Sequence, residues 1–283
     1  MTNVLILNDT SSELHHGCEL VMRNIKTLLL QNSMTIIGTS YCGSSFLSNH
    51  VLFRKLPVTD LVIVNGEGTL HSSQPRAQEL MRMVEYIKKK KSLPIVLINS
   101  FYHNNNSEII KLTRLFDLIF VRTVKDRSQL SKYNIKSRVV PDLTFYNKIN
   151  TDSKKDCSFI SVTDGYLDLF SNKMLLFAKK KKYNFLPIRT DRRIKKFNFK
   201  SFFGFVKYHL FKKILYPIWI SGIKLNYLEE SRFYYTQNYN HYIKKISKSK
   251  FLITGRFHAA CFALKTLTPF FFVEHGINTH KAK

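Results

Sequence analysis

Short apolar runs alternate with longer amphipathic segments along most of this 283-residue chain. The runs are rich in β-branched residues and end in Gly, Asn or Asp, a pattern typical of buried strands. The segments between them place apolar residues three or four positions apart, which is typical of helices. Strands and helices that alternate across short links predict an α/β protein with parallel sheets flanked by helices.

Both halves of the chain follow this alternation, and the polar stretch Asn147–Asp156 between them predicts a linker. In the first half the predicted strands are Val4–Leu7, Thr35–Thr39, the LVIVN run after Asp60, Pro94–Asn99, Leu118–Val121 and Ser137–Val140, and the predicted helices are Glu19–Leu30, Gln74–Lys90, Glu108–Leu115 and Asp126–Tyr133. In the second half the predicted strands are Phe159–Val162, Tyr183–Ile188, Phe251–Ile253 and Phe270–Val273, and the predicted helices are Leu167–Lys179, Tyr239–Ser247 and Ala259–Lys265. We therefore expect two Rossmann-like domains, residues 1–148 and 156–283, that face a cleft.

The charge is strongly positive, with 45 Lys and Arg against 19 Asp and Glu and a formal net charge of +26. Such an excess bears on partners rather than on the fold, and it favours nucleic acid, an anionic membrane surface or acidic substrates. A bias of the coding sequence towards Lys, Asn, Ile, Phe and Tyr explains the lysine runs equally well.

The segment Arg192–Tyr227 combines nine Lys or Arg with many aromatic residues and contains no acidic residue. Such a segment can stack on single-stranded nucleic acid, lie at a membrane interface or form the basic outer face of a core. No nucleic-acid-binding motif accompanies it, so we expect peripheral contact with an anionic membrane and no nucleic acid.

Four cysteines, Cys18, Cys42, Cys157 and Cys261, are far apart and follow no metal-binding spacing, which is typical of reduced thiols in the cytoplasm. The first residues, MTNVLILNDT, lack a basic n-region, so we expect no signal peptide. A cytoplasmic location follows, with possible contact at the inner face of the cell membrane.

The segment Leu252–Val273 contains the clearest candidate site. An apolar strand stops before Gly255, Arg256 and His258 follow, and an Ala-rich helix begins. A helix start holds anions, Arg adds a planar fork for carboxylate or phosphate, and His moves protons near neutral pH. The alternative is a buried structural pair between Arg256 and a carboxylate.

A second candidate follows the LVIVN strand, where the chain reads NGEGTLH. Gly66 and Gly68 allow the backbone to approach a ligand, and Glu67 and His71 are candidate acid or base groups. The alternative is a tight strand-to-helix turn in which Glu67 is solvated.

A third candidate is the sequence HHGCE after the first strand, where His16 and Gly17 begin a loop that we expect to line the cleft. Adjacent histidines do not easily share one ion, so we expect no metal here. An ordinary helix-capping region is the alternative.

The fourth candidate is Arg122, which comes just after a strand, together with Asp142 beyond Pro141. Residues at strand ends are placed to bind substrate in parallel sheets. The alternatives are a surface salt bridge for Arg122 and a turn cap for Asp142.

Four segments resemble motifs of the polysaccharide pyruvyl transferase family, in the order in which the family has them. GRFHAACFAL followed by Pro269 resembles its GRxHA-type motif, and DLVIVNGEGTL resembles its glycine-ended strand. VRTVKDRSQL with VVPDLTF, and HHGCELVMRNIKTLL, resemble its central and N-terminal motifs. The resemblance spans roughly Val4–Val273. Cys18 and Glu67 stand where the family usually has Asp and Gly.

The resemblance implies a GT-B-like fold and transfer of a pyruvyl group from phosphoenolpyruvate to two hydroxyls of a cell-surface glycan. It implies no metal or cofactor, and an acceptor that is a glycan or a lipid-linked oligosaccharide. The donor-binding Arg and His of the family fall on Arg256 and His258, and a further Arg falls on Arg122. We expect His258 to move a proton and Glu67 or His16 to activate the acceptor hydroxyl.

Two other functions use the same residues. A glycosyltransferase would bind the diphosphate of a nucleotide sugar at the same helix start, with Glu67 as base. A basic binding protein on a decayed enzyme scaffold would use the charge alone.

Overall fold

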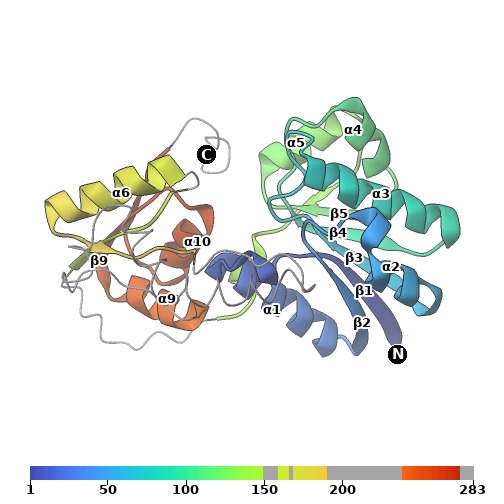
Figure 1. Ribbon diagram of the computed structural model, residues 1–283, viewed down its shortest axis with the longest axis horizontal. Helices are drawn as coiled ribbons and strands as arrows, with labels where there is room; N and C mark the ends of the chain where they lie inside the picture. The colour runs from blue at the N-terminus through green and yellow to red at the C-terminus, as the bar shows by residue number, and fades with distance from the viewer. Residues whose placement is uncertain (149–158, 166–167, 190–237, 275–283) are drawn as a thin grey trace, which may run out of the picture. The chain divides into compact units, whose positions relative to one another are not determined.

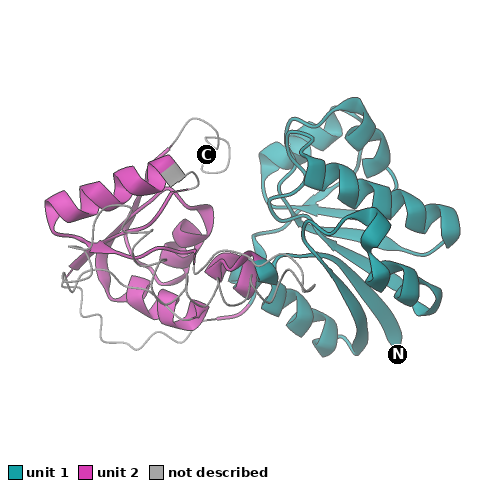
Figure 2. Cartoon of the chain, viewed as in Figure 1, with its two compact units in different colours: residues 1–12, 20–146 teal, residues 13–19, 147–283 magenta. Residues whose placement is uncertain are grey.

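The computed structural model divides into two compact units (Figures 1 and 2). It describes residues 1–148, 159–165, 168–189 and 238–274. Unit 1 comprises Met1–Ser12 and Leu20–Tyr146, and unit 2 comprises Glu13–Glu19 and Asn147–Lys283. The segment Glu13–Glu19 is therefore grouped with the second half of the chain, which a division along the sequence does not anticipate.

Unit 1 contains a six-stranded parallel sheet in the order β2-β1-β3-β4-β5-β6. Its strands are β1 (Thr2–Asp9), β2 (Met34–Tyr41), β3 (Leu61–Asn65), β4 (Ile95–Ser100), β5 (Leu118–Val121) and β6 (Arg138–Val139). The sequence predicted all six. Because the strands are parallel, their carboxyl ends lie along one edge of the sheet, where ligands bind in such folds.

Five helices of unit 1 connect these strands: α1 (His16–Gln31), α2 (His50–Lys55), α3 (Pro75–Lys90), α4 (Ser107–Thr113) and α5 (Val124–Ser131). Local signals explain their ends. Asn106 caps α4, and Thr123 with Asp126 forms a reciprocal capping box at α5. The sequence analysis missed α2 and the short 3₁₀ turns Ser11–Glu13, Phe46–Ser48, Leu56–Val58 and Leu143–Phe145, since each is too short to show a helical period.

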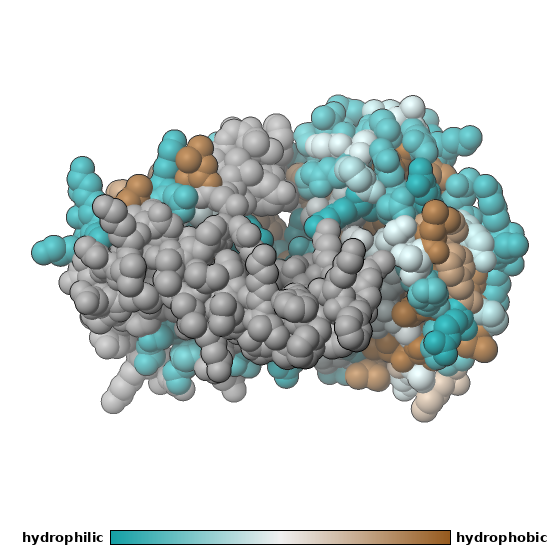
Figure 3. Space-filling view, viewed as in Figure 1, coloured by the Kyte–Doolittle hydropathy of each residue, from teal (hydrophilic) through white to brown (hydrophobic). Residues whose placement is uncertain are grey.

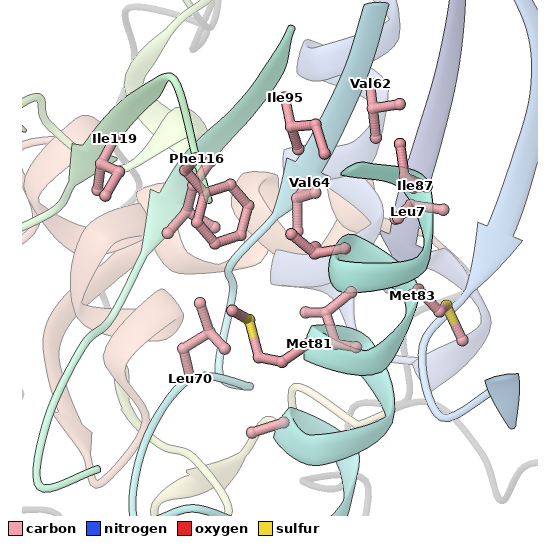
Figure 4. Close-up of a cluster of buried hydrophobic side chains, with 14 of the residues drawn as sticks. Leu7, Val62, Val64, Leu70, Met81, Met83, Ile87, Ile95, Phe116 and Ile119 are labelled. Carbon is pink, nitrogen blue, oxygen red and sulfur yellow. The ribbon is translucent and has the colours of Figure 1, made fainter. Parts of the chain in front are cut away.

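Two hydrophobic clusters cover the faces of this sheet. The larger one packs α3 and α4 against the strands, and Figure 4 shows Met81 and Ile87 of α3 next to Val64 and other strand residues. The smaller one packs α1 against the opposite face through Val21 and Ile25. Burial on both faces explains why the strands read as continuous apolar runs rather than as alternating patterns.

Unit 2 contains a four-stranded parallel sheet in the order β10-β9-β7-β8. The strands are β7 (Phe159–Val162), β8 (Asn184–Phe185), β9 (Ser249–Thr254) and β10 (Phe270–Phe272), and the helices are α6 (Asp168–Lys181), α9 (Tyr239–Ser247) and α10 (Phe257–Lys265). The predicted strand Tyr183–Ile188 is shorter in the structure. Pro187 has no N–H to donate, so strand pairing does not continue through it.

The surface of unit 1 exposes several large hydrophobic residues around α2. Leu47 is 85% exposed and Val58 is 55% exposed, and Figure 3 shows brown hydrophobic residues on the right-hand side of unit 1, which carries α2. Among the described residues, no helix combines the length and hydrophobicity needed to cross a membrane. The basic segment Arg192–Tyr227 lies outside the described residues.

Replacing Met81 by Ala tests the core of unit 1. Its side chain is fully buried between α3 and the sheet, so Met81→Ala leaves a cavity and lowers the free energy of unfolding by about 2–5 kcal/mol. The neighbouring control Arg82→Ala removes only an exposed ion pair with Glu79 and costs less than about 1 kcal/mol. Urea unfolding followed by circular dichroism measures both, and equal effects would contradict this packing.

Candidate active site

The N-terminus of α10 forms the centre of the candidate site in unit 2. Strand β9 ends at Thr254, Gly255 follows, and Arg256 occupies the N-cap position before the first turn of α10. The Arg256 side chain makes no capping hydrogen bond to the helix. The positive end of the helix dipole, with His258 in its first turn, favours an anion at this position.

A buried ion pair holds Arg256 in place. Its Nη2 lies 2.6 Å and its Nε 3.1 Å from Oδ2 of Asp164, and both side chains are less than 10% exposed. Asp164 follows β7, and its Oδ1 accepts the backbone N–H of Ile188 at 2.7 Å. The structural Arg–carboxylate pair considered as an alternative is thus present, and it joins the chain after β7, β8 and β9.

The segment Glu13–Glu19 packs against the start of α10 within unit 2. The rings of His15 and His258 are 5.3 Å apart and meet edge to face. A Cβ atom at Gly17 would lie 2.3 Å from Cγ of His258, so only glycine fits beside this ring. The Gly17 backbone therefore fixes where the His258 imidazole lies.

His16 occupies a packing position next to this contact. Its ring is fully buried, lies 5.0 Å from the Tyr242 ring and has its Nδ1 3.6 Å from the Glu19 carboxylate. Its backbone N–H donates to Ile188. His16 and His15, although adjacent, thus face different surroundings.

The surroundings of this segment are cationic. Burial lowers the pKa of the His15 imidazole well below its usual value. Electrostatic repulsion from His258, Arg256, His16 and Arg189 lowers this pKa further. A neutral His15 adds no charge of its own, whereas the arginines attract anions. Burial and the Asp164 charge raise the pKa of the Tyr242 hydroxyl well above its usual value.

His15, Cys18 and His258 form a possible metal-ligand group. One ligand atom from each lies within 4.8 Å of the others. The sequence analysis rejected a metal because adjacent histidines do not easily share an ion. In the structure, the two histidines near Cys18 are His15 and His258, which are far apart in the sequence.

A second polar group lies at the carboxyl ends of β1 and β3 in unit 1. Glu67 is only 5% exposed, and its Oε2 accepts hydrogen bonds from the Thr10 hydroxyl at 2.6 Å and from Asn65 Nδ2 at 3.4 Å. The alternative of a solvated Glu67 is therefore wrong. A Cβ atom at Gly66 would lie 2.5 Å from Cβ of Ser100, which explains this glycine.

The other residues proposed in this loop have distinct positions. Gly68 has a φ of +60°, the left-handed conformation that favours glycine, with nothing within 4 Å of the Cβ it lacks. His71 is part of an isolated bridge with His103, and its ring lies 5.7 Å from that of Phe101.

Arg122 and Asp142, which were proposed separately, form one buried ion pair in unit 1. Arg122 Nη1 lies 2.8 Å from Asp142 Oδ2, with the side chains 4% and 2% exposed. Oδ1 of Asp142 accepts the backbone N–H of Thr144 at 2.9 Å, and the Arg122 guanidinium lies 6.0 Å from the Phe101 ring centre. The salt bridge considered for Arg122 exists, but it is buried rather than on the surface.

The comparison with known protein families decides the identity of the chain. A family model described as polysaccharide pyruvyl transferase matches residues 15–276, which is most of the chain. The chain belongs to the polysaccharide pyruvyl transferase family. It is therefore a transferase that acts on a glycan, and the resemblance seen in its four motifs is confirmed.

Solved structures place this pyruvyl transferase in the GT-B fold. UDP-N-acetylglucosamine 2-epimerase from Rickettsia bellii has a TM-score of 0.55 and 9% identity, with 97% of this chain and 80% of that chain covered. The UDP-GlcNAc 2-epimerase from Neisseria meningitidis has a TM-score of 0.52 and 11% identity, with 98% and 83% covered. Such low identities establish the fold alone. No curated protein sequence matches this chain significantly.

The polysaccharide pyruvyl transferase thus places its predicted residues in two groups. Unit 2 contains Gly17, His16, Gly255, Arg256 and His258, and unit 1 contains the remaining candidates, which are Gly66, Glu67, Gly68, His71, Arg122 and Asp142. Sequence reasoning missed Asp164, and it considered His15 only as part of the HHGCE loop without assigning it a role. Asp164 was detectable, because it lies two residues after the predicted buried strand Phe159–Val162.

Replacing Asp164 by Asn tests the buried pair of unit 2. The change leaves the Arg256 charge buried without a counterion, and we expect a loss of about 3–5 kcal/mol in the free energy of unfolding. Glu85→Gln is the control, because its ion pair with Lys89 is exposed and contributes less than about 1 kcal/mol. Urea unfolding distinguishes the two, and an Asp164→Asn protein as stable as the control would refute the role of this pair.

Replacing Tyr242 by Phe tests the buried hydroxyl. Above about pH 10 the unfolded chain ionises this tyrosine while the native protein does not, so stability falls as pH rises, by about 1.4 kcal/mol per pH unit. Below pH 10 the group contributes no pH dependence. Tyr242→Phe should flatten the decline between pH 10 and 11.

The control for this experiment is Tyr41→Phe, at a tyrosine that is 54% exposed. It should leave the slope of unfolding free energy against pH unchanged, because lysine titration is common to all three proteins. Identical slopes for the Tyr242→Phe and native proteins would show that the hydroxyl is not shielded from water.

Proposed function

We propose that this pyruvyl transferase takes its pyruvyl group from phosphoenolpyruvate and attaches it as a ketal to two hydroxyls of a cell-surface glycan, free or lipid-linked. The observation that carries the proposal is the start of α10, where His258 and an anion-attracting helix end lie together. Phosphoenolpyruvate is a small anion with both a carboxylate and a phosphate, and such groups bind well at a helix N-terminus.

The donor assignment follows from the charges in unit 2. Arg256 donates from its Nε and Nη2 to Asp164, so it orients the helix start, and we assign its guanidinium charge to attraction of the donor. Arg189, which is exposed and forms an isolated bridge with His15, adds a second positive charge. Hydrogen bonds to charged groups in a protected site are strong, so no metal or cofactor is needed to hold the anion.

The reaction balances as follows. A proton adds to the terminal carbon of the enol, the carbon bearing the phosphate becomes electrophilic, and one acceptor hydroxyl attacks it. The C–O bond to phosphate breaks, the second hydroxyl forms the second C–O bond, and a ketal and inorganic phosphate result. The two acceptor hydroxyls release two protons. One balances the proton added to the new methyl group, and the other is taken up by the phosphate.

We assign the proton transfer at the donor to His258, whose ring is fixed by Gly17. Activation of the acceptor hydroxyl falls to Glu67 or His16. Glu67 is better suited, because Thr10 and Asn65 orient its carboxylate, whereas His16 is packed against Tyr242. We assign Gly255 to donor binding, because it lies between the end of β9 and Arg256.

The remaining candidates in unit 1 are assigned to substrate binding: Arg122, Asp142, His71, Gly66 and Gly68. Because the Arg122 charge is matched by Asp142, the pair is suited to hydroxyl groups at least as well as to a second donor anion.

A nucleotide-sugar glycosyltransferase is the second candidate. The neighbouring Neisseria meningitidis structure is bound to UDP-GlcNAc, and a helix start that binds phosphoenolpyruvate also suits a diphosphate. Thermal-shift measurements separate the two, because stabilisation by a uridine nucleotide without stabilisation by phosphoenolpyruvate favours the second candidate.

Contact with the inner face of the cell membrane also belongs to the proposal. It would bring the enzyme to lipid-linked acceptors, and the positive charge of +26 favours an anionic surface. Its main support, the basic aromatic segment Arg192–Tyr227, is an argument from sequence alone. Nucleic acid is not expected as a partner.

Replacing His258 by Gln tests the proposed chemistry. The purified enzyme is incubated with phosphoenolpyruvate and a panel of glycans, and pyruvate ketals are detected by mass spectrometry. His258→Gln should lower kcat about 10²–10⁴-fold, the usual contribution of a general acid. His241→Gln, an exposed histidine on α9, should retain full activity. Absence of any ketal with the native enzyme, or equal activity of both variants, would contradict the proposal.

A further inference from the structure

Three metal-ligating side chains converge in unit 2 without an assigned role as a group. His15 and Cys18 come from the segment that leads into α1, and His258 comes from the first turn of α10. One ligand atom of each lies within 4.8 Å of the other two. Figure 2 shows the first turn of α1 in the colour of unit 2, the unit that contains α10.

Local structure brings these side chains together. The Glu19 N–H donates to the His15 carbonyl, so the chain turns helically here and residues three apart share a face. His15 and Cys18 are three apart. Gly17, which has no side chain, allows the His258 ring to approach this face closely.

One hydrogen bond of His15 is exchanged when an ion binds. Its Nδ1 accepts the backbone N–H of Gly17 at 3.1 Å, so the neutral ring carries its proton on Nε2. An ion bound at Nδ1 replaces this N–H, and an ion bound at Nε2 requires the proton to move to Nδ1.

The donor set selects the class of ion. A thiolate and two imidazoles suit Zn²⁺ and chemically similar soft cations, whereas Mg²⁺ and Ca²⁺ require oxygen ligands. Zn–N and Zn–S bonds of about 2.0–2.3 Å place tetrahedral ligand atoms about 3–4 Å apart. Ligand atoms within 4.8 Å of one another need only a small contraction to reach this geometry.

The positive surroundings do not prevent cation binding. The guanidinium of Arg256 is paired with Asp164, and Arg189 is exposed to solvent. Deprotonation of Cys18 on binding adds a negative charge at the site itself.

We propose that His15, Cys18 and His258 bind a zinc-class divalent cation as three protein ligands with one open coordination position. The ion is coordinated by the His258 imidazole, so that this ring is no longer able to transfer a proton. Metal occupancy therefore inhibits pyruvyl transfer. This last consequence rests on the proposed function, whereas the binding site does not.

Cobalt titration tests the site directly. The native protein, purified in chelator and then freed of it, is titrated with Co²⁺ and afterwards with Zn²⁺. We expect one equivalent of Co²⁺ to produce tetrahedral d–d bands and a thiolate-to-cobalt charge-transfer band, and Zn²⁺ to displace it. Cys18→Ser should lose the charge-transfer band and bind Zn²⁺ at least 10-fold more weakly. Cys42→Ser, which removes a buried thiol from unit 1, should behave like the native protein.

The site is refuted if the native protein binds no stoichiometric Co²⁺, or if Cys18→Ser retains the native spectrum. Should Cys18→Ser fail to fold by circular dichroism, X-ray absorption of the native zinc protein decides, because the site requires one sulfur and two imidazole donors. In activity assays, Zn²⁺ should inhibit the native enzyme and Cys42→Ser but not Cys18→Ser. A native protein that binds Co²⁺ as expected yet forms no ketal would refute the proposed function and leave the metal site intact.

Discussion

The buried ion pair between Arg256 and Asp164 is the constraint on which the candidate site depends. Two opposite charges, 92 residues apart in sequence, meet at 2.6 Å with little exposure to water. A charge in the protein interior is costly unless its counterion is accurately placed, so the ends of β7 and β9 are tied together. Asp164 also binds the Ile188 backbone, which extends the constraint beyond β8. The start of α10 is therefore fixed before any ligand arrives.

The same constraint explains how His258 acquires a defined position. His258 is two residues after Arg256 in the sequence, and the backbone of Gly17 confines its ring on one side. A proton-transfer group must be held accurately, because small displacements cost catalysis heavily. The segment Glu13–Glu19 thus contributes to the site of unit 2 although it precedes most of unit 1 in sequence.

Much of this architecture could be predicted from the sequence, because parallel strands buried on both faces leave continuous apolar runs. The strand ends at Asn65 and Thr254, which precede two of the candidate motifs, were predicted correctly. What the sequence could not provide is the choice of partners. Nothing local indicates that Arg122 pairs with Asp142, or that Glu67 is buried beside Thr10, since these contacts depend on the packing of distant segments.

The histidines illustrate the same limit. The adjacent pair His15 and His16 appeared in the sequence as one feature, yet the first faces His258 and the second packs on Tyr242. Their separation follows from the start of α1, where successive side chains point in different directions. The local structure of the GRxHA-type motif, by contrast, was predicted correctly, because its strand, turn and helix start are consecutive in the chain.

The most direct test is a crystal structure of this pyruvyl transferase soaked with phosphoenolpyruvate. The account predicts that the phosphate or carboxylate of the donor lies within hydrogen-bonding distance of the first N–H groups of α10 and of the His258 imidazole, with the Arg256–Asp164 pair intact. A donor bound elsewhere, touching neither this helix start nor His258, would contradict it.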